Sequence, residues 1–230
     1  IPMVGDKVKL AQDVDLIEEI LPRKNKLTRP AVANIDYLGI VIASRDPTPD
    51  YLLVDKLIVY ACMQNIEPII IINKVDIEKS DIDQILNMYA GTGWHVLPVS
   101  CKTGEGIEEL SYAFSDGITT LAGQSGVGKS SLLNALHPSL NLEVGEISEK
   151  LKRGKHTTRY VELLSLPHGG MVVDTPGFSF VAIKNIDERV VGECYPEFEK
   201  YRYDCRFGVR CIHKNEPDCN IKKHVEKGII

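Results

Sequence analysis

The segment Gly-Gln-Ser-Gly-Val-Gly-Lys-Ser at residues 123–130 constrains the fold more than any other feature. It matches the pattern G-x-x-x-x-G-K-[ST], in which backbone N–H groups wrap phosphate groups at the N-terminus of a helix. The expected strand 118–121 precedes it and the expected helix 131–136 follows it, so a strand and a helix flank the loop as the motif requires. This context predicts an α/β protein that binds a nucleoside phosphate, with a chance Gly-rich turn as the alternative.

Each position of this loop has an expected role. Lys129 is expected to reach the β- and γ-phosphates, and the hydroxyl of Ser130 is expected to ligate Mg²⁺. The phosphate-site candidates are Gly123, Gln124, Ser125, Gly126, Val127, Gly128, Lys129, Ser130 and Ser131.

Apolar runs alternate with amphipathic stretches from residue 36 to residue 183. Such alternation predicts a mainly parallel sheet with helices on both faces. The expected strands are Leu38–Ala43, Pro68–Ile72, His95–Val99, Ile118–Leu121, Tyr160–Leu166 and Met171–Val173. The expected helices are Asp50–Gln64, Asp81–Tyr89, Gly106–Phe114 and Lys129–Leu136.

Two motifs that follow expected strands indicate guanine as the base. In Asn-Lys-Val-Asp at 73–76, the Asp76 carboxylate can accept hydrogen bonds from two adjacent guanine N–H groups, a pair that adenine does not offer. Ser-Cys-Lys at 100–102, with Gly104, is placed to contact guanine O6 through backbone N–H groups. Taken alone, the first motif also fits a helix N-terminus and the second an ordinary loop. The base-site candidates are Asn73, Lys74, Asp76, Ser100, Cys101 and Lys102.

The segment Asp-Thr-Pro-Gly at 174–177 follows another expected strand. We expect Asp174 to hold a water bound to Mg²⁺ and the N–H group of Gly177 to contact the γ-phosphate. It is therefore a candidate switch segment.

A second candidate switch is Gly-Lys-His-Thr-Thr-Arg at 154–159, within the long stretch 140–159 that has no clear periodicity. Thr157 or Thr158 is placed to ligate Mg²⁺, and we favour Thr158. The alternative for this stretch is a solvated basic loop.

These motifs occur in an unusual order. The base-reading motifs at 73–76 and 100–104 precede the phosphate loop at 123–130, whereas the usual order is the reverse. Circular permutation explains this order, because strand packing does not depend on where the chain is cut. Since the second switch runs directly into residues 184–230, we expect a nucleotide-dependent shift to act on that segment.

The order of motifs, the stretch 154–158 and a tail rich in Cys and His resemble the circularly permuted GTPases that assist maturation of the bacterial small ribosomal subunit (the RsgA type). Residues 17–25 and 29–34 resemble the junction between the OB-fold and the GTPase domain of that family. The resemblance implies a partial OB-fold-like β segment at 1–35, a circularly permuted P-loop GTPase domain at 36–183 and a helical zinc-binding domain at 184–230. We expect only the last part of an OB-fold in this sequence.

The tail offers three thiolates and one imidazole, in Cys205, Cys211, His213 and Cys219. This set suits one tetrahedral structural Zn²⁺ and leaves no open position for catalysis. The gap from Cys205 to Cys211 is one residue longer than the spacing usual in the family, and Cys194 is the alternative ligand. The remaining cysteines, Cys62 and Cys101, are expected to be packing residues.

The expected reaction is hydrolysis of GTP to GDP and phosphate, with Mg²⁺ bound. Phe178 stands where many GTPases place a Gln that orients water, and the resemblance implies that His156 of the switch takes this role. Contact of His156 with RNA or solvent is the alternative. Lys129, the loop N–H groups and Mg²⁺ are expected to stabilise the phosphoryl charge.

The net charge and the length of the longest apolar run argue against two other classes of protein. The 230 residues carry 27 Lys+Arg against 32 Asp+Glu, a net charge of −5, which disfavours a general polyanion binder. The apolar run 69–72 is far shorter than the roughly 20 residues that span a bilayer. This length excludes a transmembrane protein. We expect a cytoplasmic monomer without membrane association.

Three basic stretches are candidates for contact with ribosomal RNA: residues 150–160, residues 22–30 and the tail. In the tail, cations alternate with rings that suit stacking on bases, and a solvated charged surface is the alternative. These tail residues are Arg202, Arg206, Arg210, Lys214, Lys222 and Lys223, with Tyr201, Tyr203 and Phe207.

We expect a GTPase that binds the small ribosomal subunit and its rRNA and assists late maturation. One alternative is a nucleotide-gated RNA-binding assembly factor with negligible turnover of its own. Another is an ATP-dependent P-loop enzyme, which conflicts with the carboxylate at Asp76.

Overall fold

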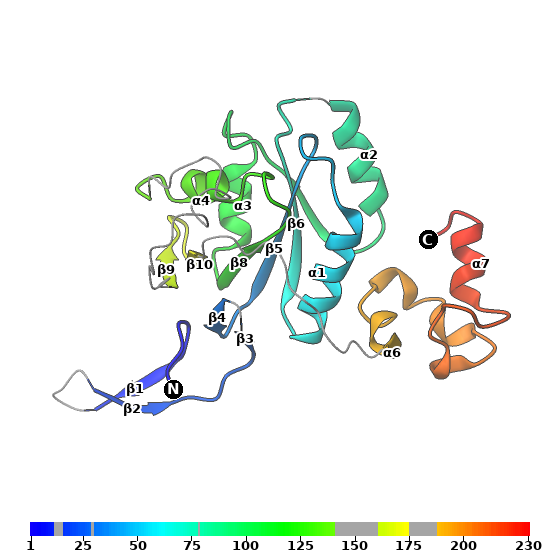
Figure 1. Ribbon diagram of the computed structural model, residues 1–230, viewed down its shortest axis with the longest axis horizontal. Helices are drawn as coiled ribbons and strands as arrows, with labels where there is room; N and C mark the ends of the chain where they lie inside the picture. The colour runs from blue at the N-terminus through cyan, green and yellow to red at the C-terminus, as the bar shows by residue number, and fades with distance from the viewer. Residues whose placement is uncertain (12–15, 29, 78, 141–160, 175–187) are drawn as a thin grey trace, which may run out of the picture.

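A computed structural model of the chain describes residues 1–11, 16–28, 30–77, 79–140, 161–174 and 188–230. Its centre is a six-stranded sheet with the order β7-β6-β5-β8-β10-β9 (Figure 1). The first five strands in this order are parallel, and β9 is antiparallel to β10. The strands are β5 (Tyr37–Ala43), β6 (Glu67–Asn73), β7 (His95–Pro98), β8 (Ile118–Ala122), β9 (Glu162–Ser165) and β10 (Met171–Asp174).

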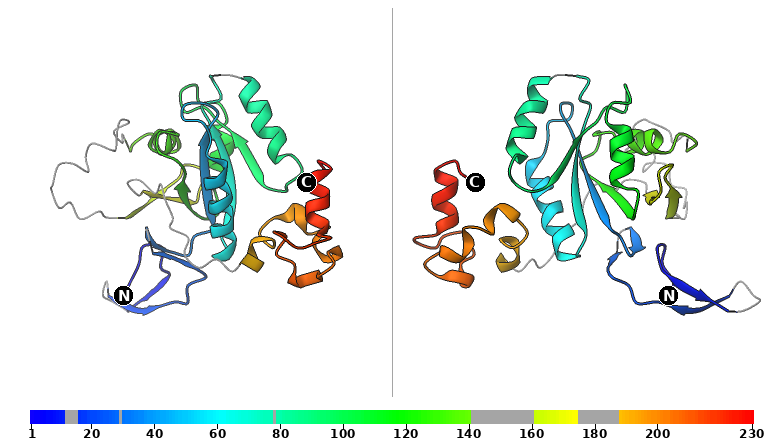
Figure 2. Two further views of the ribbon diagram at one scale, coloured as in Figure 1. Left: turned by 45° about the vertical axis from the view of Figure 1, so that its right-hand side comes forward. Right: turned by 180° about the vertical axis from the view of Figure 1, so that it is seen from behind.

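Helices cover both faces of this sheet, as the sequence predicts. The helices are α1 (Tyr51–Met63), α2 (Lys79–Tyr89), α3 (Ile107–Ala113) and α4 (Lys129–Leu136). Figures 1 and 2 show α1 and α2 on one face and α3 and α4 on the other. Alternate isoleucines of β6 point to opposite faces of the sheet. Ile70 and Ile72 pack in the core with α1 and α2, whereas Ile69 and Ile71 pack with α3 and α4. The run 69–72 is thus buried on both faces, as expected.

The parallel arrangement decides where the motifs meet. The carboxyl ends of parallel strands lie at one edge of the sheet, and ligands of open α/β sheets bind at this edge. The loops after β5, β6, β7 and β8 all leave from this edge, and β5 and β6 pair in register up to Ala43 and Asn73. The base-reading motifs and the phosphate loop therefore lie at the same edge of the sheet, although the base-reading motifs come first in the sequence.

The N-terminal part forms two small antiparallel pairs, β1 (Val8–Leu10) with β2 (Ile17–Ile20) and β3 (Lys26–Thr28) with β4 (Ala31–Ala33). Apolar and polar residues alternate over 4–10, which predicts a strand there, but β1 begins only at Val8. The backbone of Gly5 is left-handed at φ +84°, and a Cβ there would lie 2.2 Å from the carbonyl oxygen of Ala33. The sequence does not predict the pair β3 and β4, because strands of three residues carry no readable period.

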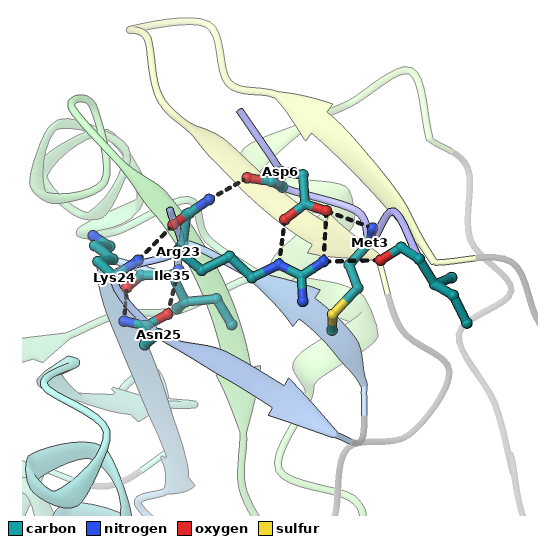
Figure 3. Close-up of polar contacts among 9 residues, drawn as sticks. Met3, Asp6, Arg23, Lys24, Asn25 and Ile35 are labelled. Atoms are coloured by element: carbon teal, nitrogen blue, oxygen red, sulfur yellow. Dashed lines mark hydrogen bonds and ion pairs between the residues drawn. The ribbon is translucent and has the colours of Figure 1, made fainter. Parts of the chain in front are cut away.

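A polar network joins this N-terminal part to the start of β5 (Figure 3). Arg23 donates two hydrogen bonds to the Asp6 carboxylate, at 2.6 and 2.8 Å. The side chain of Asn25 exchanges two hydrogen bonds with the backbone of Ile35, at 2.7 and 2.9 Å. Asp36 then accepts from the N–H group of Ile118 at 2.8 Å, so the network reaches the first residue of β8.

The C-terminal part is a series of short helical turns, α6 (Glu188–Val191), η1 (Pro196–Phe198), η2 (Arg202–Asp204), η3 (Gly208–Arg210) and α7 (Asn220–Glu226). The sequence predicts short helices from Asp187 to Lys200, and the structure shows α6 ending at Val191 and a 3₁₀ turn that begins at Pro196. A Cβ added to Gly93 would lie 3.4 Å from Cβ of Pro196, which shows that this part packs against the loop between α2 and β7. Among the described residues, no helix is long and apolar enough to cross a membrane.

Candidate functional site

The phosphate loop runs from the end of β8 to the start of α4. Gly123 has φ +144°, and a Cβ there would lie 2.1 Å from the carbonyl oxygen of Val41 on β5. Gly128 has φ +97°, and a Cβ there would lie 2.3 Å from Nδ2 of Asn73 on β6. Glycine is required at both positions because of the left-handed backbone and the close approach of neighbouring strands. The remaining expected phosphate-site residues lie in the loop between them or in the first turn of α4.

The ammonium group of Lys129 lies across this loop. It donates to the carbonyl oxygens of Gly123 and Gln124, both at 2.8 Å. Burial lowers the pKa of Lys129 to about 8, because the protein interior disfavours the charged form. The cation that the phosphates require is therefore held in place and loses its proton more readily than an exposed lysine.

The side chain of Asn73 connects the base-reading motif to the phosphate loop. Its Nδ2 donates to the carbonyl oxygen of Val127 at 2.8 Å. Its Oδ1 accepts from the backbone N–H group and from the thiol of Cys101, both at 3.3 Å. Asn73 is buried, with 1% of its surface exposed. One amide therefore holds together the ends of β6, β7 and β8.

The carboxylate of Asp76 is positioned by the next motif along the sheet edge. The hydroxyl of Ser100 donates to Oδ1 of Asp76 at 2.7 Å and accepts from the N–H group of Thr103 at 3.1 Å. The ammonium of Lys102 lies 3.7 Å from Oδ2 of Asp76. The hydrogen bond from Ser100 is the main reason that the pKa of Asp76 lies below its usual value, and Lys102 lowers it further. This carboxylate is ionised at neutral pH, as a double acceptor for a base must be.

A cavity of about 650 Å³ opens between these two motifs and the start of α4. It has the size of a small-molecule site, and its wall includes residues from the base-reading motifs and from the phosphate loop. The lining residues that matter here are Asn73, Lys74, Asp76, Cys101, Lys102 and Gly128. A base in this cavity lies next to the phosphate loop, so the geometry fits one nucleotide across both motifs.

The loop after β5 belongs to this site, although no motif predicts it. The backbone of Lys74 is left-handed at φ +67°, its carbonyl oxygen accepts from the Ser44 hydroxyl at 2.8 Å, and its ammonium donates to the carbonyl oxygen of Asp46. Ser44 follows the apolar run 38–43 directly, so it leaves β5 at the same edge as the recognised motifs. Its position after this strand is the feature of the sequence that could have assigned the loop to the site, since the loop residues match no known motif.

Several expected site residues fall outside the described part of the chain. These are His156, Thr157, Thr158, Gly177 and Phe178. Asp174 is the last residue of β10, which pairs in parallel with the phosphate-loop strand β8.

The four expected metal ligands come together in the C-terminal part. The ligand atoms of Cys205, Cys211, His213 and Cys219 all lie within 4.8 Å of one another. Sγ of Cys205 lies 3.9 Å from Sγ of Cys219, and Nδ1 of His213 lies 3.3 Å from the latter sulfur. Three sulfurs and one ring nitrogen at such separations fit a tetrahedral Zn²⁺ site. Cys194 does not belong to this group; its thiol donates to the carbonyl oxygen of Val190.

A carboxylate shapes the loop that presents the histidine ligand. Glu216 accepts hydrogen bonds from three backbone N–H groups, of Ile212 at 2.8 Å, Lys214 at 2.9 Å and Asn215 at 3.1 Å. His213 lies within this loop in a left-handed conformation, with φ +62°. The bonds to Glu216 hold a strained backbone in the shape that points the imidazole at the three sulfurs. The sequence carries no signal for this role, because only the folded loop shows which N–H groups Glu216 accepts.

The fold and the nucleotide site define a circularly permuted P-loop GTPase, a protein that hydrolyses GTP. The chain belongs to the RsgA GTPase family, whose model matches residues 20–184. The expected fold class is thus confirmed.

Individual relatives agree with this assignment. The protein named small ribosomal subunit biogenesis GTPase RsgA from Caldanaerobacter subterraneus is 47% identical, and the match covers 100% of this chain and 79% of the relative. The protein of the same name from Moorella thermoacetica is 44% identical over 98% of this chain and 79% of its own length. The crystal structure of YjeQ from Thermotoga maritima superposes with a TM-score of 0.84 at 37% identity, covering 100% of this chain and 79% of that one. YloQ, described as a circularly permuted GTPase, superposes with a TM-score of 0.80 at 34% identity, covering 99% of this chain and 75% of its own.

The lowered pKa of Lys129 predicts a pH dependence of nucleotide binding. As the pH rises through about 8, the ammonium loses its proton and attracts phosphate less, so GTP affinity should fall by about tenfold for each further pH unit. Titration with a fluorescent GTP analogue between pH 7 and 9.5 measures this slope. Lys129→Arg stays charged over that range and should show a much flatter profile, whatever its affinity. Equal slopes in both proteins would assign the effect to other groups.

The role of Glu216 predicts a loss of zinc affinity on its removal. Glu216→Ala leaves three N–H groups without their acceptor, and zinc affinity should fall by about 10- to 100-fold. Competition with a chromophoric chelator measures this change. Glu226→Ala, on the exposed end of α7, is the matched control and should retain zinc like the unmodified protein. Equal zinc retention by both variants would contradict the assignment.

Proposed function

We propose that this chain is a Mg²⁺-dependent GTPase that takes part in the biogenesis of the small ribosomal subunit and binds its rRNA. The observation that carries the proposal is the amide of Asn73, which joins a guanine-selecting motif to a phosphate loop in one cavity. The partner is taken from relatives that carry the name small ribosomal subunit biogenesis GTPase and match nearly the whole chain. A cytoplasmic monomer fits this function.

The proposed binding mode follows the geometry of the site. The guanine base enters the cavity, where Asp76 accepts from its N–H groups and the loop residues Cys101 and Lys102 border its O6 atom. The β- and γ-phosphates lie in the loop 123–130, where Lys129 turns from its loop carbonyls to the phosphate oxygens. The same loop N–H groups bind GDP after hydrolysis.

Mg²⁺ supplies charge neutralisation on the β- and γ-phosphate oxygens during hydrolysis. We propose Ser130 and Thr158 as its protein ligands, with Asp174 positioning a water of its hydration shell. Gly177 is proposed to contact the γ-phosphate through its N–H group. His156 is proposed to position the attacking water, because Phe178 offers no hydrogen-bonding group.

A structural Zn²⁺ is proposed for the Cys205, Cys211, His213 and Cys219 cluster. Four protein ligands complete a tetrahedral shell, so this metal stabilises the C-terminal part and takes no share in hydrolysis. The N–H group of Asn220 donates to Sγ of Cys205 at 3.2 Å, which helps to hold this sulfur in position.

The described surface favours the tail as the RNA-binding part. Arg206 lies 5.8 Å from the ring centre of Phe207, and both side chains are exposed, so a cation and a ring lie side by side as a base-stacking surface requires. Acidic partners offset part of the charge in both stretches: Arg23 pairs with Asp6 and Lys24 with Asp36, and in the tail Arg206 pairs with Asp218 and Lys214 with Glu188. The exposed rings of Tyr203 and Phe207 therefore distinguish the tail from 22–30. The stretch 150–160 lies outside the described residues.

GTP turnover by this chain, alone and with purified small ribosomal subunits, tests the proposed partner. Stimulation by small subunits should reach about tenfold or more, since an ordered switch stabilises the phosphoryl charge as activating partners of other GTPases do. Large subunits and ATP are the controls. Equal stimulation by both subunits, or none, would refute the proposed partner and leave the GTPase assignment intact.

The base-reading role of Asp76 predicts a change of nucleotide preference. Asp76→Asn replaces a charged double acceptor by an amide, and the affinity for GTP should fall by about two orders of magnitude, while weak ATP binding should be unchanged. Titration with GTP, GDP and ATP measures the ratio. Asp83→Asn, on the exposed side of α2, is the matched control and should bind like the unmodified protein. An unchanged preference in Asp76→Asn would favour a different base.

A further inference from the structure

We propose that Cys101 is a positioning residue of the nucleotide site, whose thiol holds the Asn73 amide that ties the phosphate loop to the guanine cavity. The sequence predicts only a packing role for this side chain, and a base contact for its backbone N–H group alone. The proposal concerns nucleotide affinity only, so it stands or falls independently of the ribosomal partner.

The distances show why the thiol matters. Oδ1 of Asn73 accepts from the N–H group of Cys101 at 3.3 Å, which is long for a bond of this type. The thiol of the same residue reaches the same oxygen at 3.3 Å, a short separation for a bond that includes sulfur. The side chain thus adds a second donor where the backbone bond is weak.

The thiol is in the form that can donate. Burial is the main reason that the pKa of Cys101 is raised to about 11, and the charge of Asp76 contributes. At neutral pH the group is therefore S–H, and not a thiolate that would repel Oδ1 of Asn73. Within the described part of the chain, its contact with Asn73 is the one hydrogen bond that the structure gives to this thiol.

The amide that the thiol holds controls the shape of the phosphate loop. Nδ2 of Asn73 donates to the carbonyl oxygen of Val127, a fully buried residue of that loop. With this carbonyl turned to Asn73, the neighbouring N–H groups are available to surround an anion. If the amide turned over, its oxygen would face the Val127 carbonyl and repel it.

The space around the Asn73 amide is narrow, so a small displacement of this side chain affects the phosphate loop. Nδ2 of Asn73 occupies the space beside Gly128 that a Cβ would otherwise fill, at 2.3 Å. The amide therefore fits in one orientation and at one depth, and a group that keeps it there contributes to binding of both GTP and GDP. A small loss of order at Oδ1 is transmitted through the rigid planar amide to the loop backbone.

Three variants separate hydrogen bonding from packing. Cys101→Val keeps the bulk of the side chain and removes the donor, Cys101→Ala removes both, and Cys101→Ser keeps a donor in a smaller side chain. Cys62→Ala, at a partly buried cysteine of α1, is the matched control. Affinities for GTP and GDP are measured by titration with fluorescent analogues, and kcat is measured separately.

The proposal predicts that Cys101→Val and Cys101→Ala each weaken binding of GTP and GDP by about threefold, as the loss of one weak hydrogen bond implies. Cys101→Ser and Cys62→Ala should bind within a factor of about 1.5 of the unmodified protein, and kcat at saturation should change less than affinity. Affinity in Cys101→Val equal to that of the unmodified protein would overturn the proposal. A loss in Cys101→Ser equal to that in Cys101→Ala would also overturn it.

A spectroscopic measurement tests the contact without relying on affinity. The infrared S–H stretch of Cys101 is obtained as the difference between the unmodified protein and Cys101→Ser. A thiol that donates to Asn73 should absorb at lower frequency than it does in the Asn73→Ala background, where its acceptor is missing. An identical band in the two backgrounds would show that no such hydrogen bond exists.

Discussion

The nucleotide site depends on one buried amide. Asn73 ends strand β6, yet its side chain contacts both the loop after β7 and the loop after β8, through Cys101 and Val127. A buried amide must satisfy both its donor and its acceptor, because an unpaired polar group in the interior costs about 1–3 kcal/mol. That requirement holds three loops at fixed distances. The Asp76 carboxylate and the phosphate loop at Gly128 therefore border one preorganised cavity.

Circular permutation leaves this arrangement intact, because the sheet aligns loops by strand direction and not by chain order. The phosphate-loop strand β8 lies beside β5 at the centre of the sheet, although three strands of the domain precede it in sequence. Burial of β6 from both faces fixes the register that brings Asn73 beside Ala43. Permutation does change the connection made after the last parallel strand. In the sequence, the C-terminal part with its cluster of Cys and His side chains follows β10.

The sequence predicts much of the fold and of the candidate site wherever neighbouring residues form a recognisable pattern. The helix expected over Asp50–Gln64 is observed as Tyr51–Met63, because Asp50 accepts from the N–H group of Leu53 and caps it. Residue type also singled out Cys205, Cys211, His213 and Cys219, and the structure brings their ligand atoms within 4.8 Å of one another. Strands β3 and β4 were missed because their three residues are held by buried Leu27 and Val32 and not by any pattern. The expected basic surface at 22–30 is partly neutralised by Asp6 and Asp36, which lie at distant or unpatterned positions.

The sequence alone determined the class of the protein and the residues of its main motifs, because glycines, a lysine and a carboxylate at fixed spacing have few other uses. The tertiary structure decided how these motifs act together. It placed Ser100 on Asp76, the thiol of Cys101 on Asn73 and the carboxylate of Glu216 under the His213 loop. Hydrogen bonds need atoms within about 3 Å, and partners separated by 24 or 28 residues meet only after the strands have packed. The sequence thus determines which chemical groups the motifs carry, while the distances between these groups depend on the assembled sheet.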